Sequence, residues 1–377
     1  MKLFPLYIGA FIMCFLSGCR DDIVISGSEG SDVTDPVDNG IAGFYLLNEG
    51  NMGSNKCSLD YFDELLGVYT KNIYAERNPS AVKELGDVGN DLVIYGSKLY
   101  AVINCSHKVE VMKASDAKRI TQIDVPNCRY LCGYKDYIYV SSYVGGAVID
   151  PKAPRGAVYK IDTLTYNIVG KVDVGYQPEE MAISGEKLYV ANSGGYRAPD
   201  FDNTVSVIDL RSFTNIRTIT VADNLHRVKA DRYGKIYVSS RTDNYGHKSK
   251  LHIIDTSAGE VEKVIDIPVD NMWVEGDSAY IFGVRKDTAG KSKVQYSIFD
   301  LQKTEVVNSG FITDGTDAGI KVPYGIAVHP VTKDIYITDA KNYVTSGTLY
   351  CFSRDGVLKW RQLAGNIPSN FAFMHKK

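Results

Sequence analysis

The sequence predicts an all-β fold, a seven-bladed β-propeller in which each blade has four strands. Two observations support this prediction. A short strand motif recurs seven times along the chain, and a segment at the C-terminal end repeats the inner strand of a blade with no blade after it. Short strands that repeat every 39 to 56 residues are typical of propeller blades.

The recurring motif is a turn followed by an apolar residue, a tyrosine and further apolar residues. Its seven copies are Phe44-Tyr45-Leu46, Leu99-Tyr100-Ala101, Ile138-Tyr139-Val140, Leu188-Tyr189-Val190, Ile236-Tyr237-Val238, Ala279-Tyr280-Ile281 and Ile335-Tyr336-Ile337. Most copies are followed by an alternating strand that ends in Asp or Ser, then by a turn and a more polar strand. With the inner strand that precedes the motif, each unit has the four strands of a blade.

The inner-strand pattern predicts how the ring closes. It begins with proline at 178–183 and at 323–328, and a third copy at 368–373 stands near the end of the chain. The first tyrosine-containing strand, at 43–48, has no inner strand before it. We therefore expect the C-terminal segment to supply the inner strand of the first blade, so that N- and C-terminal strands share one blade and pair their exposed edges.

Residues 178–209 resemble the YVTN-type (YncE-like) propeller repeat, whose core reads Pro-x-x-Ile-Ala, a turn, Leu-Tyr-Val-x-Asn, a loop and Val-x-Val-Ile-Asp. The resemblance extends over about residues 43–374. It implies the propeller fold and says little about a ligand, because one fold serves many functions.

The N-terminal end predicts export and a lipid anchor. Lys2 precedes an apolar stretch at 3–16, which is too short to span a bilayer comfortably and suits a signal peptide. Leu16-Ser17-Gly18-Cys19 closely resembles the bacterial lipobox, which implies cleavage before Cys19 and lipidation of its thiol. The alternative is an ordinary secretory signal that has a cysteine there by chance.

This interpretation divides the chain into a lipoprotein signal peptide at 1–18, a lipid anchor with a flexible tether at 19–42, and the propeller at 43–377. Few large apolar side chains at 23–42 favour the flexible tether. Arg20-Asp21-Asp22 resembles the surface-export signal of Bacteroidetes lipoproteins. The resemblance implies an outer-membrane protein that is held by its lipid and exposed at the cell surface.

Charge and cysteine content narrow the functions. The formal net charge is −3 and no basic block could meet a phosphate backbone, so nucleic-acid binding is not expected. Apart from Cys14 and Cys19 the chain has five cysteines, and an odd number cannot all pair. Cys105 and Cys128 are the first pair to examine for a disulfide, and buried free thiols are the alternative. No zinc-ligand spacing occurs, so no metal is expected.

One face of the predicted propeller is the candidate functional face. In a four-stranded meander the 2–3 and 4–1 connections share one face, and here most 2–3 loops are long and rich in polar and aromatic residues. Long loops on a rigid scaffold commonly bind ligands. The candidate ligand-binding residues are Asn48, Glu49, Asn51, Tyr143, Tyr176, Tyr196, Arg197, Arg227, Arg241, Tyr245, Trp273, Arg285, Tyr324 and Tyr343. The alternative for each is a solvated or loop-packing role.

Catalysis is not expected, and no catalytic residue is assigned. The sequence has no His-Glu-x-x-His, Gly-x-Ser-x-Gly or phosphate-loop motif. Four acids recur at equivalent ends of the third strands: Asp162, Asp209, Asp255 and Asp300. We expect them to bond backbone N–H groups in turns, a common role of Asp, rather than to form a catalytic pair.

The leading functional hypothesis is a surface lipoprotein that captures a small nutrient on the loop face and passes it to an outer-membrane transporter. The Leu-Asn-Glu-Gly-Asn run at 47–51 resembles the start of propeller lipoproteins associated with Bacteroidetes uptake systems. Resemblance to the cobalamin-capturing members implies a corrinoid, bound as a ligand and not as a cofactor, and a TonB-dependent transporter as partner. The alternatives are a glycan-binding or surface-layer adhesion propeller and a metal-dependent propeller lyase or hydrolase.

Overall fold

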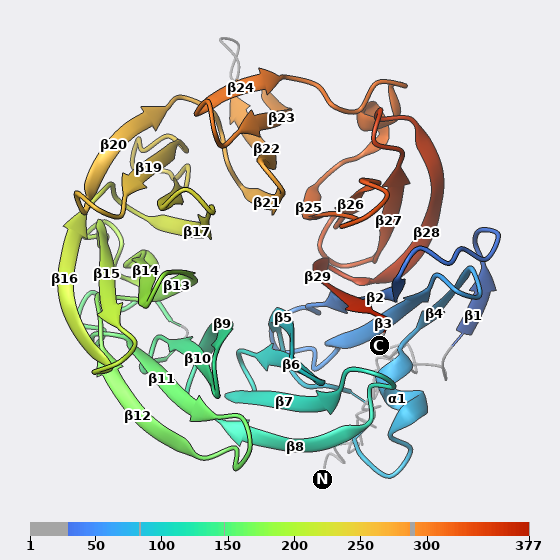
Figure 1. Ribbon diagram of the computed structural model, residues 1–377, viewed down its shortest axis with the longest axis horizontal. Coiled ribbons are helices and arrows are strands. Elements are labelled where there is room, and N and C mark those ends of the chain that lie inside the picture. The colour runs from blue at the N-terminus through green and yellow to red at the C-terminus, as the bar shows by residue number, and fades with distance from the viewer. Residues whose placement is uncertain (1–28, 83, 147, 287–290, 377) are drawn as a thin grey trace, which may run out of the picture.

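The computed structural model describes residues 29–82, 84–146, 148–286 and 291–376. Seven antiparallel sheets stand around a central axis, and Figure 1 looks along that axis onto the ring of blades. Six sheets have four strands, and the sheet of blade 1 has five. The expected seven-bladed propeller is confirmed. The expected signal peptide and Cys19 lie outside the described residues.

In each blade the strands run in order from the centre of the ring to its rim. The inner strands are β5 (Gly89–Tyr95), β9 (Cys128–Tyr134), β13 (Pro178–Ser184), β17 (Leu225–Ala230), β21 (Asn271–Glu275), β25 (Pro323–Val328) and β29 (Pro368–His375). The second strands are β2 (Ile41–Asn48), β6 (Lys98–Ile103), β10 (Tyr137–Ser142), β14 (Lys187–Asn192), β18 (Lys235–Ser240), β22 (Ser278–Lys286) and β26 (Ile335–Asp339).

The outer half of each blade completes the sheet. The third strands are β3 (Ser58–Asp63), β7 (Lys108–Lys113), β11 (Ala157–Asp162), β15 (Thr204–Asp209), β19 (Leu251–Asp255), β23 (Ser292–Asp300) and β27 (Ser346–Phe352). The fourth strands are β4 (Val68–Lys71), β8 (Arg119–Asp124), β12 (Ile168–Asp173), β16 (Thr214–Thr220), β20 (Glu260–Ile265), β24 (Glu305–Asn308) and β28 (Leu358–Asn366).

Short elements lie outside this pattern: β1 (Glu29–Asp32), α1 (Ile73–Arg77) and the 3₁₀ turns η1 (Gly195–Arg197) and η2 (Thr316–Gly319). In the part of the chain that the structure describes, no helix is long and apolar enough to cross a membrane.

The ring closes as the sequence predicts. β29 is the inner strand of blade 1 and pairs antiparallel with β2, with Leu46 opposite Phe371 and Tyr45 opposite Ala372. The closure also buries aromatic surface, because the ring of Phe371 lies 5.6 Å from that of Phe44, which has no exposed surface. Hydrogen bonds and apolar burial therefore both hold the two ends of the chain together.

The ordered structure begins before residue 43, the boundary expected from the sequence. β1 pairs antiparallel with β4 and adds a fifth strand at the rim of blade 1, because β4 otherwise presents an unpaired edge. Farther along, the Asn39 amide donates to Glu64 (3.0 Å) and Ile41 is fully buried. The part of the expected tether from 29 to 42 thus belongs to blade 1.

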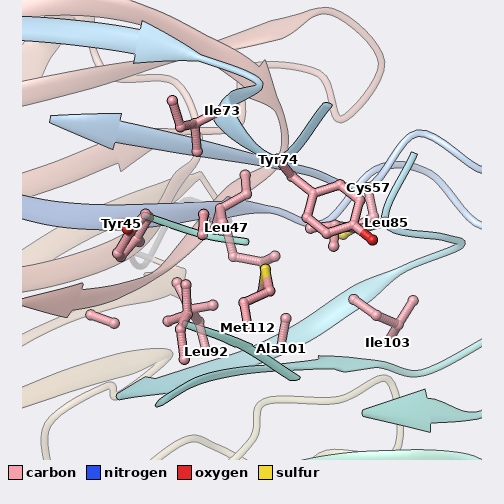
Figure 2. Packing of buried hydrophobic residues seen from close by; sticks show 14 of the residues in the cluster. Tyr45, Leu47, Cys57, Ile73, Tyr74, Leu85, Leu92, Ala101, Ile103 and Met112 are labelled. Atoms are coloured by element: carbon pink, nitrogen blue, oxygen red, sulfur yellow. The ribbon is translucent and has the colours of Figure 1, made fainter. Parts of the chain in front are cut away.

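Hydrophobic clusters between neighbouring blades form the core. Figure 2 shows the cluster between blades 1 and 2, in which Leu47 of β2 lies near Leu92 of β5 and Met112 of β7. Tyr45 of the repeated motif is buried there, and its hydroxyl donates to the carbonyl of Ala114 in blade 2 (2.9 Å). Each blade thus covers the face of its neighbour, which explains why the second strands are almost continuously apolar.

The four recurring acids have the expected turn role. Each accepts backbone N–H bonds from residues two or three positions later, as Asp209 does from Arg211 (2.8 Å) and Ser212 (3.0 Å); the other three are Asp162, Asp255 and Asp300. These backbone bonds lower the pKa of Asp162, Asp209 and Asp255. Their carboxylates are therefore engaged in the architecture of the blades.

Removing residues 368–377 should abolish the cooperative unfolding transition or lower Tm by at least about 10 °C, because the loss of β29 opens the ring and removes more than about 5 kcal/mol of apolar burial. Thermal unfolding followed by circular dichroism tests this. The control is a chain that begins at Glu29, which keeps every described contact of blade 1 and should melt like the parent. Equal melting of the two truncated chains would contradict the role of β29.

Candidate functional site

The candidate site lies at the channel along the axis of the ring, near the starts of the inner strands that surround it. In six blades the pairing of the first two strands contains a β-bulge near the start of the inner strand. In blade 4, Pro178 pairs with Asn192 and Met181 with Val190, so two residues of β13 stand opposite one of β14. Bulges redirect side chains and are common beside functional sites.

Residues from these bulges line a cavity of about 530 Å³. They are Asn90, Arg129, Tyr130, His226, Arg227 and Tyr324, and the 2–3 and 4–1 connections add Glu49, Arg241, Asp270, Lys321 and Tyr343. The 2–3 and 4–1 connections, which were expected to share a face, therefore both contribute to this cavity. We call this cavity the mouth.

A buried carboxylate organises one wall of the mouth. Glu179 binds Arg129 through Nη2 (3.0 Å) and Arg241 through Nη1 (3.0 Å), and it accepts hydrogen bonds from the hydroxyls of Tyr143 and Ser193. Burial alone would raise the pKa of Glu179, but the two guanidinium charges and the hydrogen bonds outweigh it and lower that pKa to about 2. Glu179 therefore stays charged and fixes both arginines.

A second acid, Glu49, joins blade 1 to blade 7, the two blades that meet where the ring closes. It belongs to blade 1 and accepts a hydrogen bond from the hydroxyl of Tyr324 in blade 7 (2.9 Å). Burial raises the pKa of Glu49 to about 7, although the Tyr324 bond and the charges of Arg227 and Arg129 act in the opposite direction. Glu49 therefore changes protonation near neutral pH.

Three side chains from blades 3 and 5 meet beside Glu49. The hydroxyl of Tyr130 lies 3.0 Å from Nε2 of His226, and Nη1 of Arg227 donates to that hydroxyl (3.3 Å). Burial, followed by the charges of the nearby arginines, holds the pKa of His226 well below its usual value. His226 is therefore neutral, and the positive charge here belongs to Arg227.

The mouth combines positive charge, hydrogen-bond donors and aromatic walls. Its cations are Arg129, Arg227, Arg241 and Lys321, and its acids are Glu49 and Asp270. Burial raises the pKa of Asp270 as well as that of Glu49. This arrangement suits a ligand that carries many hydrogen-bond acceptors.

Five of the predicted ligand-binding residues line the mouth: Glu49, Arg227, Arg241, Tyr324 and Tyr343. Asn51 lies beside them, and its amide donates to the carbonyl of Tyr343, which joins the loops of blades 1 and 7. Tyr324 and Tyr343, both of blade 7, also contact each other, and their ring centres are 6.0 Å apart.

Three predicted residues are engaged in structural contacts instead. Asn48 is fully buried and its amide donates to the hydroxyl of Ser58 (3.2 Å). Tyr143 is buried behind Glu179, and Arg285 forms an ion pair with Asp266 at 3.1 Å. None of these three residues lines the mouth.

Four others do not line the mouth and lie on the 2–3 and 4–1 connections of blades 3 to 5: Tyr176, Tyr196, Arg197 and Tyr245. The guanidinium of Arg197 lies 4.0 Å from the centre of the Tyr176 ring. Tyr196 packs edge-on against Tyr143 at 5.5 Å, and Tyr245 packs against Phe201 at 5.6 Å. Tyr245 is 56% exposed.

Trp273 lies in a second cavity, of about 490 Å³, which is lined by the farther parts of the inner strands. Its ring packs edge-on against Phe373 at 5.9 Å. β21 pairs with β22 without a register shift, and Trp273 stands two residues beyond Asn271, the first residue of β21. The tryptophan is therefore placed below the mouth.

Sequence reasoning missed Arg129 and Tyr130. Both occupy positions equivalent to Glu179 and Glu180 in the inner-strand repeat, because Cys128 aligns with Pro178 in the paired registers. Alignment of the inner-strand repeats could therefore have identified these two positions. The five cysteines of the described chain, including Cys105 and Cys128, are free thiols. Within the described ranges no three His, Cys, Asp or Glu side chains gather as a metal site requires.

A family model matches residues 42–356, which span most of the propeller. The chain belongs to that family, described as "Domain of unknown function (DUF5074)". No curated protein matches the sequence.

Solved structures share the fold at low sequence identity. A quinonprotein alcohol dehydrogenase-like protein from Bacteroides thetaiotaomicron has a TM-score of 0.59 and 14% identity, over 89% of this chain and 79% of that one. The hydrazine synthase of Kuenenia stuttgartiensis has 0.58 and 17%, over 75% and 88%. Apo AztD from Citrobacter koseri has 0.55 and 14%, over 89% and 98%. These similarities establish the propeller fold alone.

Replacing Glu179→Gln should lower the free energy of unfolding by about 3 kcal/mol, because Arg129 and Arg241 lose their buried counter-charge. Urea unfolding at pH 7 tests this. The control is Glu186→Gln, which removes exposed ion pairs to Lys135 and Arg211 and should cost less than about 1 kcal/mol.

The pH dependence gives a second measure of the same group. The folded-state pKa of Glu179 is lowered from 4.5 to about 2, so its contribution is complete above pH 4.5 and is lost as the pH falls toward 2. The parent should therefore lose stability more steeply than Glu179→Gln over this range. Parallel acid-unfolding curves would contradict the assignment.

Proposed function

We propose that this protein is an exported, surface-anchored lipoprotein that captures a small nutrient at the mouth. The observation that supports this most directly is the convergence of Arg129, Arg227 and Arg241 with Tyr324 and Tyr343 around one cavity on the loop face. Guanidinium groups bind carboxylates, phosphates and carbonyl groups through paired N–H donors, and tyrosines add flat apolar walls. A rigid ring preorganises these groups.

A corrinoid is the first ligand to test. Its side-chain amides and its phosphate offer many acceptors to the arginine and tyrosine donors of the mouth, and its broad macrocycle suits a site that is open to the loop face. On this proposal the protein holds the corrinoid at the cell surface and transfers it to a TonB-dependent transporter in the outer membrane. On the same proposal the protein binds its ligand without transforming it, and Glu179 and the recurring aspartates have structural roles in the arginine contacts and the turns.

A glycan ligand is the second candidate, and one observation favours it. Tyr176, Tyr196, Phe201 and Tyr245 lie outside the mouth on the connections of blades 3 to 5, and Phe201 and Tyr245 pack against each other. Sugar rings stack on aromatic side chains that present an apolar face beside a polar tip. An oligosaccharide would therefore bind over these blades, whereas a corrinoid would bind at the mouth.

Calorimetry with cyanocobalamin and a panel of oligosaccharides separates these candidates. We expect cyanocobalamin to bind, and Tyr343→Ala to weaken that binding about tenfold through the loss of one aromatic contact. The matched control is Tyr233→Ala, since Tyr233 is 42% exposed against 45% for Tyr343 but lies in a 1–2 turn on the opposite face. Absence of heat with every corrinoid would overturn the ligand assignment.

The lipid anchor has its own test. Cys19→Ser should abolish incorporation of labelled palmitate and move the protein from the membrane fraction to the soluble fraction, because the thiol is the proposed acceptor of the lipid. Cys105→Ser is the control and should leave labelling unchanged. Labelling that persists in Cys19→Ser would contradict the lipobox assignment.

A further inference from the structure

Arg227 stands at the junction of the two cavities of the channel. It lines the mouth, which opens among the 2–3 and 4–1 connections, and it also lines the second cavity, which extends along the inner strands toward the 1–2 turns. Of the residues that line the two cavities, Arg227 is the one common to both. A group bound to this guanidinium would therefore lie where the two cavities adjoin.

The other two arginines of the mouth each have a carboxylate in direct contact. Arg129 and Arg241 share the carboxylate of Glu179, each at 3.0 Å. Below the junction, Lys229 pairs with Glu180 at 2.6 Å, and Glu180 also accepts the backbone N–H of Val228. Each of these cations therefore has a carboxylate partner within the protein, which Arg129 and Arg241 share.

Arg227 differs from them. Across the described ranges of the chain no carboxylate lies within 4.0 Å of its guanidinium, and its hydrogen-bond partner is the neutral hydroxyl of Tyr130 (3.3 Å). Its Nε is buried and has no hydrogen-bond partner in the structure. Glu180 and Glu49 act on Arg227 only from a distance. A buried cation without a carboxylate in direct contact is costly, and an anion that binds there recovers part of that cost.

We propose that Arg227 anchors one oxyanion of the captured ligand, a phosphate ester, sulfate or carboxylate group, at the junction of the two cavities. The proposal rests on the capture function proposed above, because it assigns a chemical group to the same site. It restricts the ligand to molecules with an anionic group that can reach the junction of the two cavities, while the rest of the ligand occupies the mouth. Neutral oligosaccharides do not meet this requirement.

The groups that face Arg227 predict how binding depends on pH. Arg129 and Arg241 stay charged, and Tyr130, Tyr324 and His226 are neutral. Lys229 and Glu180 contact each other as an ion pair. Glu49 and Asp270 are the acids of the mouth, and the pKa of Glu49 is raised to about 7. Protonation of Glu49 removes a negative charge near the anion, so an oxyanion should bind more tightly at pH 6 than at pH 8.

Sulfate is the probe, because its charge is constant over this pH range. The chain has two tryptophans, and Trp360→Phe leaves Trp273, which lines the second cavity beside Arg227, as the reporter of fluorescence. We expect a saturable change in emission on titration with sulfate at constant ionic strength, with calorimetry as the parallel measurement. Affinity should be about fivefold higher at pH 6 than at pH 8, and Glu49→Gln should remove this difference.

Arg227→Gln should weaken sulfate binding at least about tenfold, and Arg227→Lys should retain part of it, because lysine keeps the charge but not the paired donors. The matched control is Arg232→Gln, an exposed arginine that pairs with Asp277 and should bind sulfate like the parent. Melting curves check that the variants are folded. Should Arg227→Gln fail to fold, Arg227→Lys with the pH profile provides the comparison.

The outcomes separate this proposal from the capture function. Equal sulfate affinity in parent and Arg227→Gln, or no sulfate binding by either method, overturns the anchor. Unchanged binding of cyanocobalamin by Arg227→Gln also overturns the anchor but leaves capture standing. Sulfate binding that depends on Arg227, with no binding of any organic ligand, supports the anion site and overturns the proposed capture function.

Discussion

Antiparallel hydrogen bonds between β2 and β29 join the two ends of the chain within one sheet. The sheet faces of a propeller blade pack against its two neighbours, so a ring without this pairing would have two uncovered blade faces and two free strand edges. The channel exists because seven inner strands surround it, and the seventh of them is supplied by the C-terminal segment. The mouth depends on the same closure, since Glu49 of blade 1 meets Tyr324 of blade 7 across the seam.

The same β-bulge recurs in six inner strands, but the side chains that it carries differ from blade to blade. The bulge near the start of the inner strands places side chains at equivalent points of six blades, but the residues differ: Arg129 and Tyr130 in blade 3, Glu179 and Glu180 in blade 4, His226 and Arg227 in blade 5. The acid of blade 4 neutralises the arginine of blade 3, whereas blade 5 contributes a cation that is left without a carboxylate. Different side chains at equivalent backbone positions thus make the charge distribution of the mouth asymmetric.

The features that repeat in sequence were predictable, because each is determined by local chemistry. Alternation of apolar residues around a tyrosine predicted the second strands, the unpaired copy at 368–373 predicted the closure, and the spacing of Asp209 and its equivalents predicted turns. The contacts between blades were not predictable from the sequence. Glu179 meets Tyr143 and Arg241 from positions 36 and 62 residues away, and no local pattern links these three residues. A position on a loop therefore could not distinguish Arg241, which lines the mouth, from Tyr143, which does not, although both contact Glu179. Nor could the sequence show that Trp273 lines the second cavity.

The strand at the very rim, β1, has a mechanical consequence. It has four residues, most of them exposed, and its pairing with β4 leaves the contact between β2 and β29 untouched. Force applied to the N-terminal side of the chain would load β1 first and peel it from the edge of blade 1. The next resistance is the segment that ends at the buried Ile41, where Asn39 bonds Glu64 and Glu64 contacts His329 of blade 7 (2.9 Å). Separation of β1 from β4 would therefore leave the pairing of β2 and β29, which closes the ring, intact.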